Sequence, residues 1–220
     1  MVPKGGLIGS ARKEIRQLSV GFYGAGLPHP GVEVAVAQYN KLMIHYGCKS
    51  AVGVQMQVSV ELMMLGLSFQ PFMEDYGTCE SWVTRSWLKT IWEKADRFGI
   101  EVRLGNIAMK MAREDDNWLM KEFMMLGYKK AQLERLNKVR MHQQVLFKSD
   151  VLCAGGRYLE KKYLDLRLLD ETWSSLMFPR EDPTNVDVDL WQEALDQLAP
   201  CGRVRRRVGR FVCKPHRVWD

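Results

Sequence analysis

The sequence predicts a mainly α fold: a multi-helix globular domain with few short strands and a basic C-terminal arm. Apolar residues recur at three- and four-residue steps through much of the 220-residue chain, which is the spacing of one face of an α-helix. A short strand pattern, apolar alternating with charged, appears at residues 100–104. The composition, 46% hydrophobic and 26% charged, is typical of a folded protein with a core. We expect a poorly ordered lead-in at 1–20, a helical domain at 21–200 and a basic arm at 201–220.

Two helices are predicted in the first third of the chain. Residues 21–30 contain three glycines and two prolines and are expected to form a loop. Helical periodicity begins at Gly31, and Gly47 provides a stop. Ser50 is placed to cap a second helix that runs to about Leu67. This second helix is apolar nearly all round, which predicts that it is buried.

The clearest helix follows Thr84, a candidate N-cap. Its apolar residues form a single stripe, and Gly99 follows the last of them. Residues 100–104 then provide the short strand pattern. The stripe consists of Trp87, Leu88, Ile91, Trp92, Ala95 and Phe98.

Asp115 and Asp116 form an adjacent pair of carboxylates ahead of a helical pattern that ends at Gly127. Adjacent aspartates can hold divalent metal ions, but two-metal catalysis requires carboxylates that converge on both ions, usually with one from another strand. An aspartate at the start of a helix instead accepts backbone N–H groups and meets the positive end of the helix dipole. We therefore expect this pair to cap the helix.

A helix predicted at residues 130–147 has a basic side and an apolar side. Arg135 and Lys138 lie on the basic side, which is a candidate for weak phosphate contacts. Arg140 and Gln143 fall on the apolar side, where a buried polar group requires a hydrogen-bond partner. We expect both residues to be structural anchors.

The region that precedes the arm is acidic. Residues 160–200 contain 4 Lys and Arg against 10 Asp and Glu, a formal charge of −6. A last amphipathic helix is predicted at residues 187–199 and is closed by Pro200. Residues 157–185 show no regular period and are expected to be irregular.

The arm at 201–220 contains 7 Lys and Arg against 1 Asp, a charge of +6 that equals the formal charge of the whole chain. Arginine binds phosphate with two hydrogen bonds and releases condensed counterions, and the rings of Phe211 and Trp219 could stack on unpaired bases. We expect a nucleic-acid partner, whether RNA, DNA or a hybrid, held through phosphate contacts. The alternatives are a solvated charge run and a contact with acidic protein, including the acidic segment of this chain. The candidate nucleic-acid-binding residues are Arg203, Arg205, Arg206, Arg207, Arg210, Lys214 and Arg217, with Arg135 and Lys138 as a weaker second set.

No catalytic residue, metal ligand or cofactor site is predicted. The tail offers Cys213 and His216 as one closely spaced pair, with Cys201 apart from them, whereas structural zinc requires four ligands. No phosphate-binding glycine loop, nucleophile elbow or zinc-protease motif occurs in the sequence. These observations weigh against catalysis by this chain alone.

The location of the protein is predicted from its apolar runs and its cysteines. The longest uncharged stretches, residues 50–60 and 62–73, are too short to span a bilayer. The N-terminus has no apolar run followed by a cleavage site, and the five cysteines include no Cys-x-x-Cys pair. We expect an intracellular protein, in the cytoplasm or the nucleus, without a membrane partner.

Two blocks of sequence resemble those of a known family. Gly24-Ala25-Gly26-Leu27-Pro28-His29 follows an aromatic pair and resembles the Gly-Gly-Leu-Gly-Leu/Ile-Pro signature that follows the polymerase palm in non-LTR-type retroelement reverse transcriptases. The signature is altered here to Gly-Ala-Gly-Leu. The block from Leu136 to Phe147, with Ser149-Asp150-Val151 after it, is similar to one between the polymerase and the downstream RNase H-like or tail region of those polyproteins.

Three further segments resemble blocks of the same region. They are residues 87–93, residues 113–120 and the basic segment 202–211. All the blocks occur in the family's order, and the resemblance covers about residues 21–219.

The resemblance implies a thumb- or connection-like helical segment from the post-palm region, which grips the backbone of template and primer. It implies an upstream polymerase domain as a further partner. The aromatic-x-Asp-Asp motif of the family would lie upstream, so RNA-directed DNA polymerase activity is implied for the polyprotein and no catalytic residue is carried over to this chain. The alternatives are a helical protein–protein interaction or accessory module of a polymerase, and a decayed retroelement fragment without activity.

Overall fold

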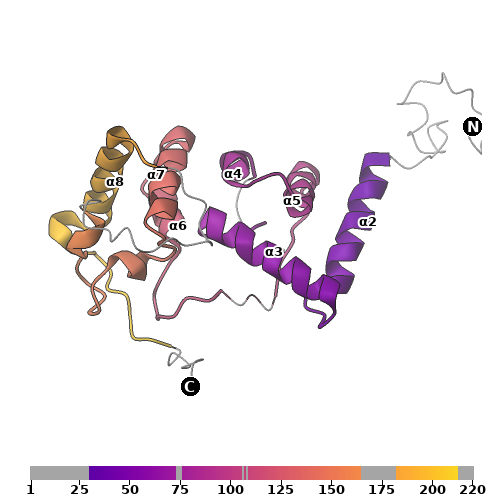
Figure 1. The fold of residues 1–220 in the computed structure, drawn as a ribbon, viewed down its shortest axis with the longest axis horizontal. Coiled ribbons are helices and arrows are strands. Elements are labelled where there is room, and N and C mark those ends of the chain that lie inside the picture. Colours follow the sequence, from indigo (N-terminus) through magenta and orange to yellow (C-terminus); the bar gives the residue numbers. More distant parts are fainter. Residues whose placement is uncertain (1–29, 73–75, 106, 108, 165–181, 213–220) are drawn as a thin grey trace, which may run out of the picture.

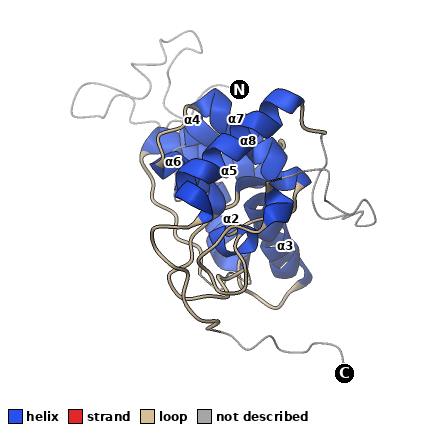
Figure 2. Cartoon of the chain, turned by 90° about the vertical axis from the view of Figure 1, so that its left-hand side faces the viewer, coloured by secondary structure: helices blue, strands red, loops and turns tan. Residues whose placement is uncertain are grey.

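The computed structural model describes residues 30–72, 76–105, 107, 109–164 and 182–212. Seven α-helices lie in this part of the chain, and within it β-pairing is limited to isolated bridges. The mainly α class is therefore confirmed (Figure 2). The α-helices are α2 (Pro30–His45), α3 (Ala51–Leu67), α4 (Tyr76–Cys79), α5 (Trp87–Phe98), α6 (Leu119–Met125), α7 (Lys130–His142) and α8 (Asn185–Leu198). The 3₁₀-helices are η2 (Glu80–Trp82), η3 (Lys148–Val151), η4 (Lys161–Tyr163) and η6 (Pro200–Gly202).

Several predicted segments fall outside the described residues. These are the lead-in at 1–20, nearly all of the loop at 21–30, the part of the irregular region at 165–181, and the end of the arm at 213–220.

The helices form two groups that share one core. At one end α2 packs against α3 and α5, and at the other α7 packs against α6 and α8 (Figure 1). The helix α3 contacts α7 and so joins the two groups. Each group contributes side chains that are at most 2% exposed, including Leu42, Met64, Trp92, Leu136 and Trp191.

The helix α3 begins as predicted but is not buried as predicted. The Ser50 hydroxyl accepts a hydrogen bond from the Gly53 backbone N–H at 3.1 Å, which confirms the cap. However, Val54, Val58 and Leu62 are 52%, 45% and 55% exposed. The prediction of burial is wrong because neighbouring helices cover only part of the α3 surface, and an all-round apolar helix carries no pattern to say which part.

The helix α5 is capped two residues later than predicted. The Ser86 side chain accepts a hydrogen bond from the Lys89 backbone N–H at 3.1 Å, so Ser86 and not Thr84 is the N-cap. Both residues are of types that favour this position, and the location of the first helical turn decides between them. The predicted end at Gly99 is confirmed by its left-handed φ of 62°. The buried stripe consists of Leu88, Ile91, Trp92 and Ala95.

Residues 100–104 do not form a strand. Val102 and Leu104 are buried, at 6% and 9% exposure, while Glu101 and Arg103, each of which precedes one of them, are exposed. The alternating pattern thus predicts which side chains face the core. It does not predict strand pairing, since among the described residues no other backbone segment pairs with this one.

Asp115 and Asp116 do not cap α6. The N-cap of α6 is Trp118, which makes no side-chain capping bond. The Asp116 Oδ1 accepts hydrogen bonds from the backbone N–H groups of Asn117 at 2.9 Å and Ser149 at 3.0 Å, so it joins two loops. Asp115 has a left-handed φ of 55°, which turns the chain before the helix begins.

The helix α7 is shorter than predicted because Gln144 takes a left-handed φ of 57°. Arg140 is fully buried and hydrogen-bonded, as expected of a structural anchor. The expectation is wrong for Gln143, since neither its Nε2 nor its Oε1 has a hydrogen-bond partner within the described part of the chain. Gln143 is the C-cap of the shortened helix and is 5% exposed, so its burial agrees with the predicted face and only the expected hydrogen bonds are missing.

The helix α8 begins with a reciprocal cap that the sequence reading missed. The Thr184 side chain accepts from the Asp187 backbone N–H, and the Asp187 carboxylate accepts from the Thr184 backbone N–H at 2.9 Å. Further along, the Trp191 Nε1–H donates to the Tyr163 carbonyl at 2.9 Å, which ties α8 to η4. This capping places the start of α8 at Asn185, two residues before the predicted start.

Candidate nucleic-acid interface

The first half of the basic arm lies along the body of the protein. We call residues 203–210 the arginine strip. At its start, the Val204 N–H donates to the Arg157 carbonyl at 3.0 Å. At its end, Glu114 and Arg210 pair through the Glu114 N–H and the Arg210 carbonyl at 2.9 Å. The strip is therefore held between two segments that precede it by about fifty and about ninety residues in the sequence.

Two valines anchor the strip and its arginines face solvent. Val204 and Val208 are 3% and 1% exposed and belong to the hydrophobic core. The loops that hold the strip gather on one side of the helices (Figure 2). The exposed arginines are Arg203, Arg205, Arg206, Arg207 and Arg210.

The contacts of these arginines leave them accessible. Arg206 forms an ion pair with Asp115 at 2.7 Å, with the two side chains 78% and 52% exposed. Such an exposed pair contributes about 0–1 kcal/mol, so a phosphate group can compete for the guanidinium. The Arg207 Nε–H donates to the Gly155 carbonyl at 3.0 Å, a bond that orients the side chain without neutralising it.

One arginine lies close to the acidic helix α8. Arg205 lines a shallow depression with Asp189, Glu193 and Asp196. The alternative prediction, in which the arm contacts the acidic segment of this chain, requires such an arrangement. Of the strip, only Arg205 lines this depression. Among the described ion pairs, the strip contributes only the one between Arg206 and Asp115.

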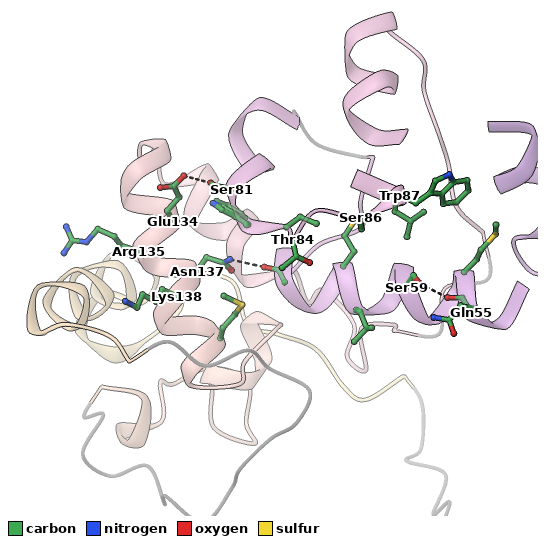
Figure 3. A pocket seen from close by; sticks show the side chains of 18 of the residues that line it. Gln55, Ser59, Ser81, Thr84, Ser86, Trp87, Glu134, Arg135, Asn137 and Lys138 are labelled. Atoms are coloured by element: carbon green, nitrogen blue, oxygen red, sulfur yellow. Dashed lines mark hydrogen bonds between the residues drawn. The ribbon is translucent and has the colours of Figure 1, made fainter. Parts of the chain in front are cut away.

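Arg135 and Lys138 lie elsewhere, in a groove between α3, α5 and α7 (Figure 3). The Arg135 Nε–H donates to Asp187 Oδ1 at 2.6 Å, and the Asp187 side chain is 8% exposed. Burial by itself raises the pKa of Asp187, but the hydrogen bonds from Arg135 and Thr184 outweigh it and lower this pKa to about 2. Arg135 is thus engaged with a carboxylate that is ionised at neutral pH and does not extend the strip.

The groove itself is mostly apolar. Its volume is about 1110 Å³, somewhat above the ~300–1,000 Å³ of ordinary small-molecule sites. Val52, Met56 and Leu62 of α3 line one wall, and Trp87 and Met141 line the others.

Three residues beside the strip were not singled out by the sequence analysis. Arg157 and Tyr158 are exposed and directly follow Gly155 and Gly156 in the sequence. Arg113 is 7% exposed, and its guanidinium lies 4.4 Å from the centre of the Phe211 ring. The adjacent basic and aromatic residues Arg157 and Tyr158 could have indicated a nucleic-acid contact, but no local sequence pattern shows that they lie near residues 203–212. Of the predicted contacts, Lys214, Arg217 and Trp219 lie outside the described residues.

The described residues contain no group of three or more His, Cys, Asp or Glu side chains arranged to hold a metal ion. Cys48, Cys79, Cys153 and Cys201 are all unbridged thiols. No helix in the described ranges combines the length and hydropathy needed to cross a membrane.

Comparison with known proteins identifies no relative. No protein-family model matches the chain, and no curated protein or solved structure shows significant similarity to it. The resemblance to the post-palm region of reverse transcriptases therefore stays a prediction.

Proposed function

We propose that this chain is a non-catalytic nucleic-acid-binding module, which contacts the phosphate backbone through the arginine strip. The observation that carries the proposal is the alternation of Val204 and Val208, which are buried, with five arginines that face solvent. A strip fixed at two buried points holds its backbone in one arrangement, so little backbone conformational entropy is lost when phosphates bind.

Backbone contacts of this kind give affinity without much sequence preference. If the five arginines neutralise about five phosphates, the log of the binding constant falls with the log of salt concentration with a slope of about −4. Fluorescence anisotropy of a labelled oligonucleotide, titrated with the full chain at several salt concentrations, measures this slope.

A matched pair of variants distinguishes binding by the arginine strip from binding by basic charge elsewhere on the protein. The strip variant Arg205→Gln/Arg206→Gln/Arg207→Gln is expected to reduce the slope to about −2 and to weaken binding at low salt. The control variant Arg85→Gln/Arg97→Gln/Arg103→Gln removes the same charge from exposed positions outside the strip. Equal losses in both variants, or binding that does not respond to salt, would remove this function.

A second candidate function is self-association, and the exposed apolar side of α2 and α3 favours it. Val54, Val58 and Leu62 lie four residues apart on α3, and Met43 and Ile44 of α2 are 71% and 64% exposed. The only ionisable side chain among the 17 residues of α3 is Glu61, so this face suits an apolar partner, and a second copy of the chain provides one.

The test of self-association is the molar mass in solution. Size exclusion with light scattering is expected to show a dimer that Val58→Lys dissociates. Val186→Lys is the control, because Val186 is 61% exposed and belongs to α8, not to α2 or α3. A wild-type chain that stays monomeric at high concentration would exclude this second candidate.

A further inference from the structure

Two exposed aromatic side chains flank the arginine strip. Tyr158 is 53% exposed and forms an isolated antiparallel bridge with Arg203 at the start of the strip. Phe211 is 62% exposed and forms the corresponding bridge with Arg113 just beyond the other end. The strip therefore carries an aromatic ring near each end, and both rings face solvent.

The ring of Phe211 is held from beneath by a buried arginine. The Arg113 guanidinium carbon lies 4.4 Å from the ring centre, and its Nη2 donates to the Ala154 carbonyl. Because Arg113 is only 7% exposed while Phe211 is 62% exposed, one face of the ring is covered and most of the rest is open to solvent. A ring fixed in this way offers a ready surface for stacking, since little side-chain entropy remains to be lost.

Tyr158 has one basic neighbour in the sequence and another across its backbone bridge. Its neighbour in sequence is the exposed Arg157, and its partner across the bridge is Arg203. Its backbone is fixed by the hydrogen bond from the Cys153 N–H to the Tyr158 carbonyl, at 2.8 Å. A base stacked on the Tyr158 ring would place its own phosphates within reach of guanidinium groups.

Exposed rings among arginines discriminate between single and double strands. A base has an open π face only when it is unpaired and unstacked, and stacking on aromatic side chains is the usual way in which proteins hold single strands. A duplex presents phosphates to the arginines but keeps its bases inside. From Arg203 to Phe211 an extended chain spans at most about 29 Å, which leaves room for several nucleotides.

We infer that the strip binds single-stranded nucleic acid, with Tyr158 and Phe211 as platforms for unpaired bases at its two ends. This inference rests on the proposed phosphate-binding function and adds the class of ligand. Arg113 is a positioning residue in this arrangement, because it supports the Phe211 ring from the buried side.

The test compares three labelled probes of twelve nucleotides: a single strand, the same sequence as a duplex, and an abasic strand that keeps only sugar and phosphate. The wild-type chain is expected to bind the single strand at least tenfold more tightly than the abasic strand. Tyr158→Leu and Phe211→Leu are each expected to weaken single-strand binding about tenfold while changing duplex and abasic binding less than twofold.

Phe98→Leu is the matched control. Phe98 is 39% exposed and also lies beside an arginine, with the Arg97 guanidinium carbon 5.8 Å from its ring centre, but it is on α5. This variant is expected to bind all three probes as the wild type does.

The outcomes separate the inference from the function on which it rests. Equal, salt-dependent binding of all three probes, unchanged by Tyr158→Leu and Phe211→Leu, would overturn base stacking and leave the phosphate contacts standing. Absence of salt-dependent binding to every probe would overturn the proposed function itself.

Discussion

Arg140 is a buried charged residue that stabilises the core through its hydrogen bonds. Its guanidinium donates to Asn137 Oδ1 at 2.7 Å, to the Val145 carbonyl at 3.0 Å, and to the carbonyls of Leu65 and Gly66 at 2.6 and 3.0 Å. The last two carbonyls belong to the final turn of α3, where carbonyl groups lack helical partners and the helix dipole is negative. Burial lowers the pKa of Arg140 to about 9, which still leaves the side chain charged at neutral pH.

Replacement of Arg140 by methionine is expected to destabilise the protein by roughly 3–5 kcal/mol, because Asn137 Oδ1 and the carbonyls of Val145 and Leu65 lose their donor, while the Gly66 carbonyl keeps only the bond from Asn137 Nδ2. Arg140→Lys should recover part of this loss, since a lysine retains the charge with fewer donors. Urea denaturation followed by tryptophan fluorescence measures both changes. The exposed Arg85→Met serves as the control, and it is expected to change stability by less than about 0.5 kcal/mol. A stable Arg140→Met variant would show that the carbonyls find other donors.

At the scale of the single helix, an apolar pattern predicts the buried face only when apolar and polar residues lie on different sides of the helix. The helix α5 has one apolar stripe and a polar remainder, so spacing alone identified the buried Leu88, Ile91, Trp92 and Ala95, although Phe98 of the predicted stripe is 39% exposed. The helix α3 is apolar on nearly every side, so its spacing identified a helix without identifying its buried face. The partial exposure of α3 depends on which neighbours reach it: α2 directly precedes it in the chain, whereas α7 follows only after α4, α5 and α6.

The cap of α5 provides a test of helix-end assignment. Ser86→Ala is expected to destabilise the protein by about 1 kcal/mol, because the Lys89 N–H loses its acceptor. Thr84→Ala is the matched control, as Thr84 is exposed and two residues outside the cap, and it should cost less than about 0.5 kcal/mol. Thermal or urea denaturation of the two variants measures the difference, and a larger loss from Thr84→Ala would contradict the assignment.

At the scale of the whole molecule, the arginine strip depends on contacts across long sequence separations. Gly156 has a left-handed φ of 66°, and its carbonyl accepts from the Val208 N–H at 2.9 Å. A Cβ atom at this position would lie 2.5 Å from the Val208 carbonyl oxygen. Gly156 therefore permits the close approach that keeps the strip against the body.

Gly156→Ala is expected to displace the strip and to lower stability by at least about 1–2 kcal/mol, from the left-handed backbone alone. Hydrogen exchange of the peptide containing Val208 should accelerate, since its amide loses the Gly156 carbonyl. Gly155→Ala is the control, because the nearest atom to a Cβ there is the Cys153 Sγ at 3.7 Å, an ordinary contact. Unchanged exchange in Gly156→Ala would mean that the strip does not depend on this approach.

The sequence by itself determined the helical class, the cap at Ser50, the end of α5 at Gly99 and the density of arginines near the C-terminus. Each of these depends on residues within about four positions of one another, which is the range of helical hydrogen bonds and caps. Only the tertiary structure decided that Arg206 meets Asp115, that Arg113 supports Phe211, and that the valines of the strip are buried. Arg206 and Asp115, like Arg113 and Phe211, are about ninety or more residues apart, and no local pattern encodes which distant segment supplies the partner.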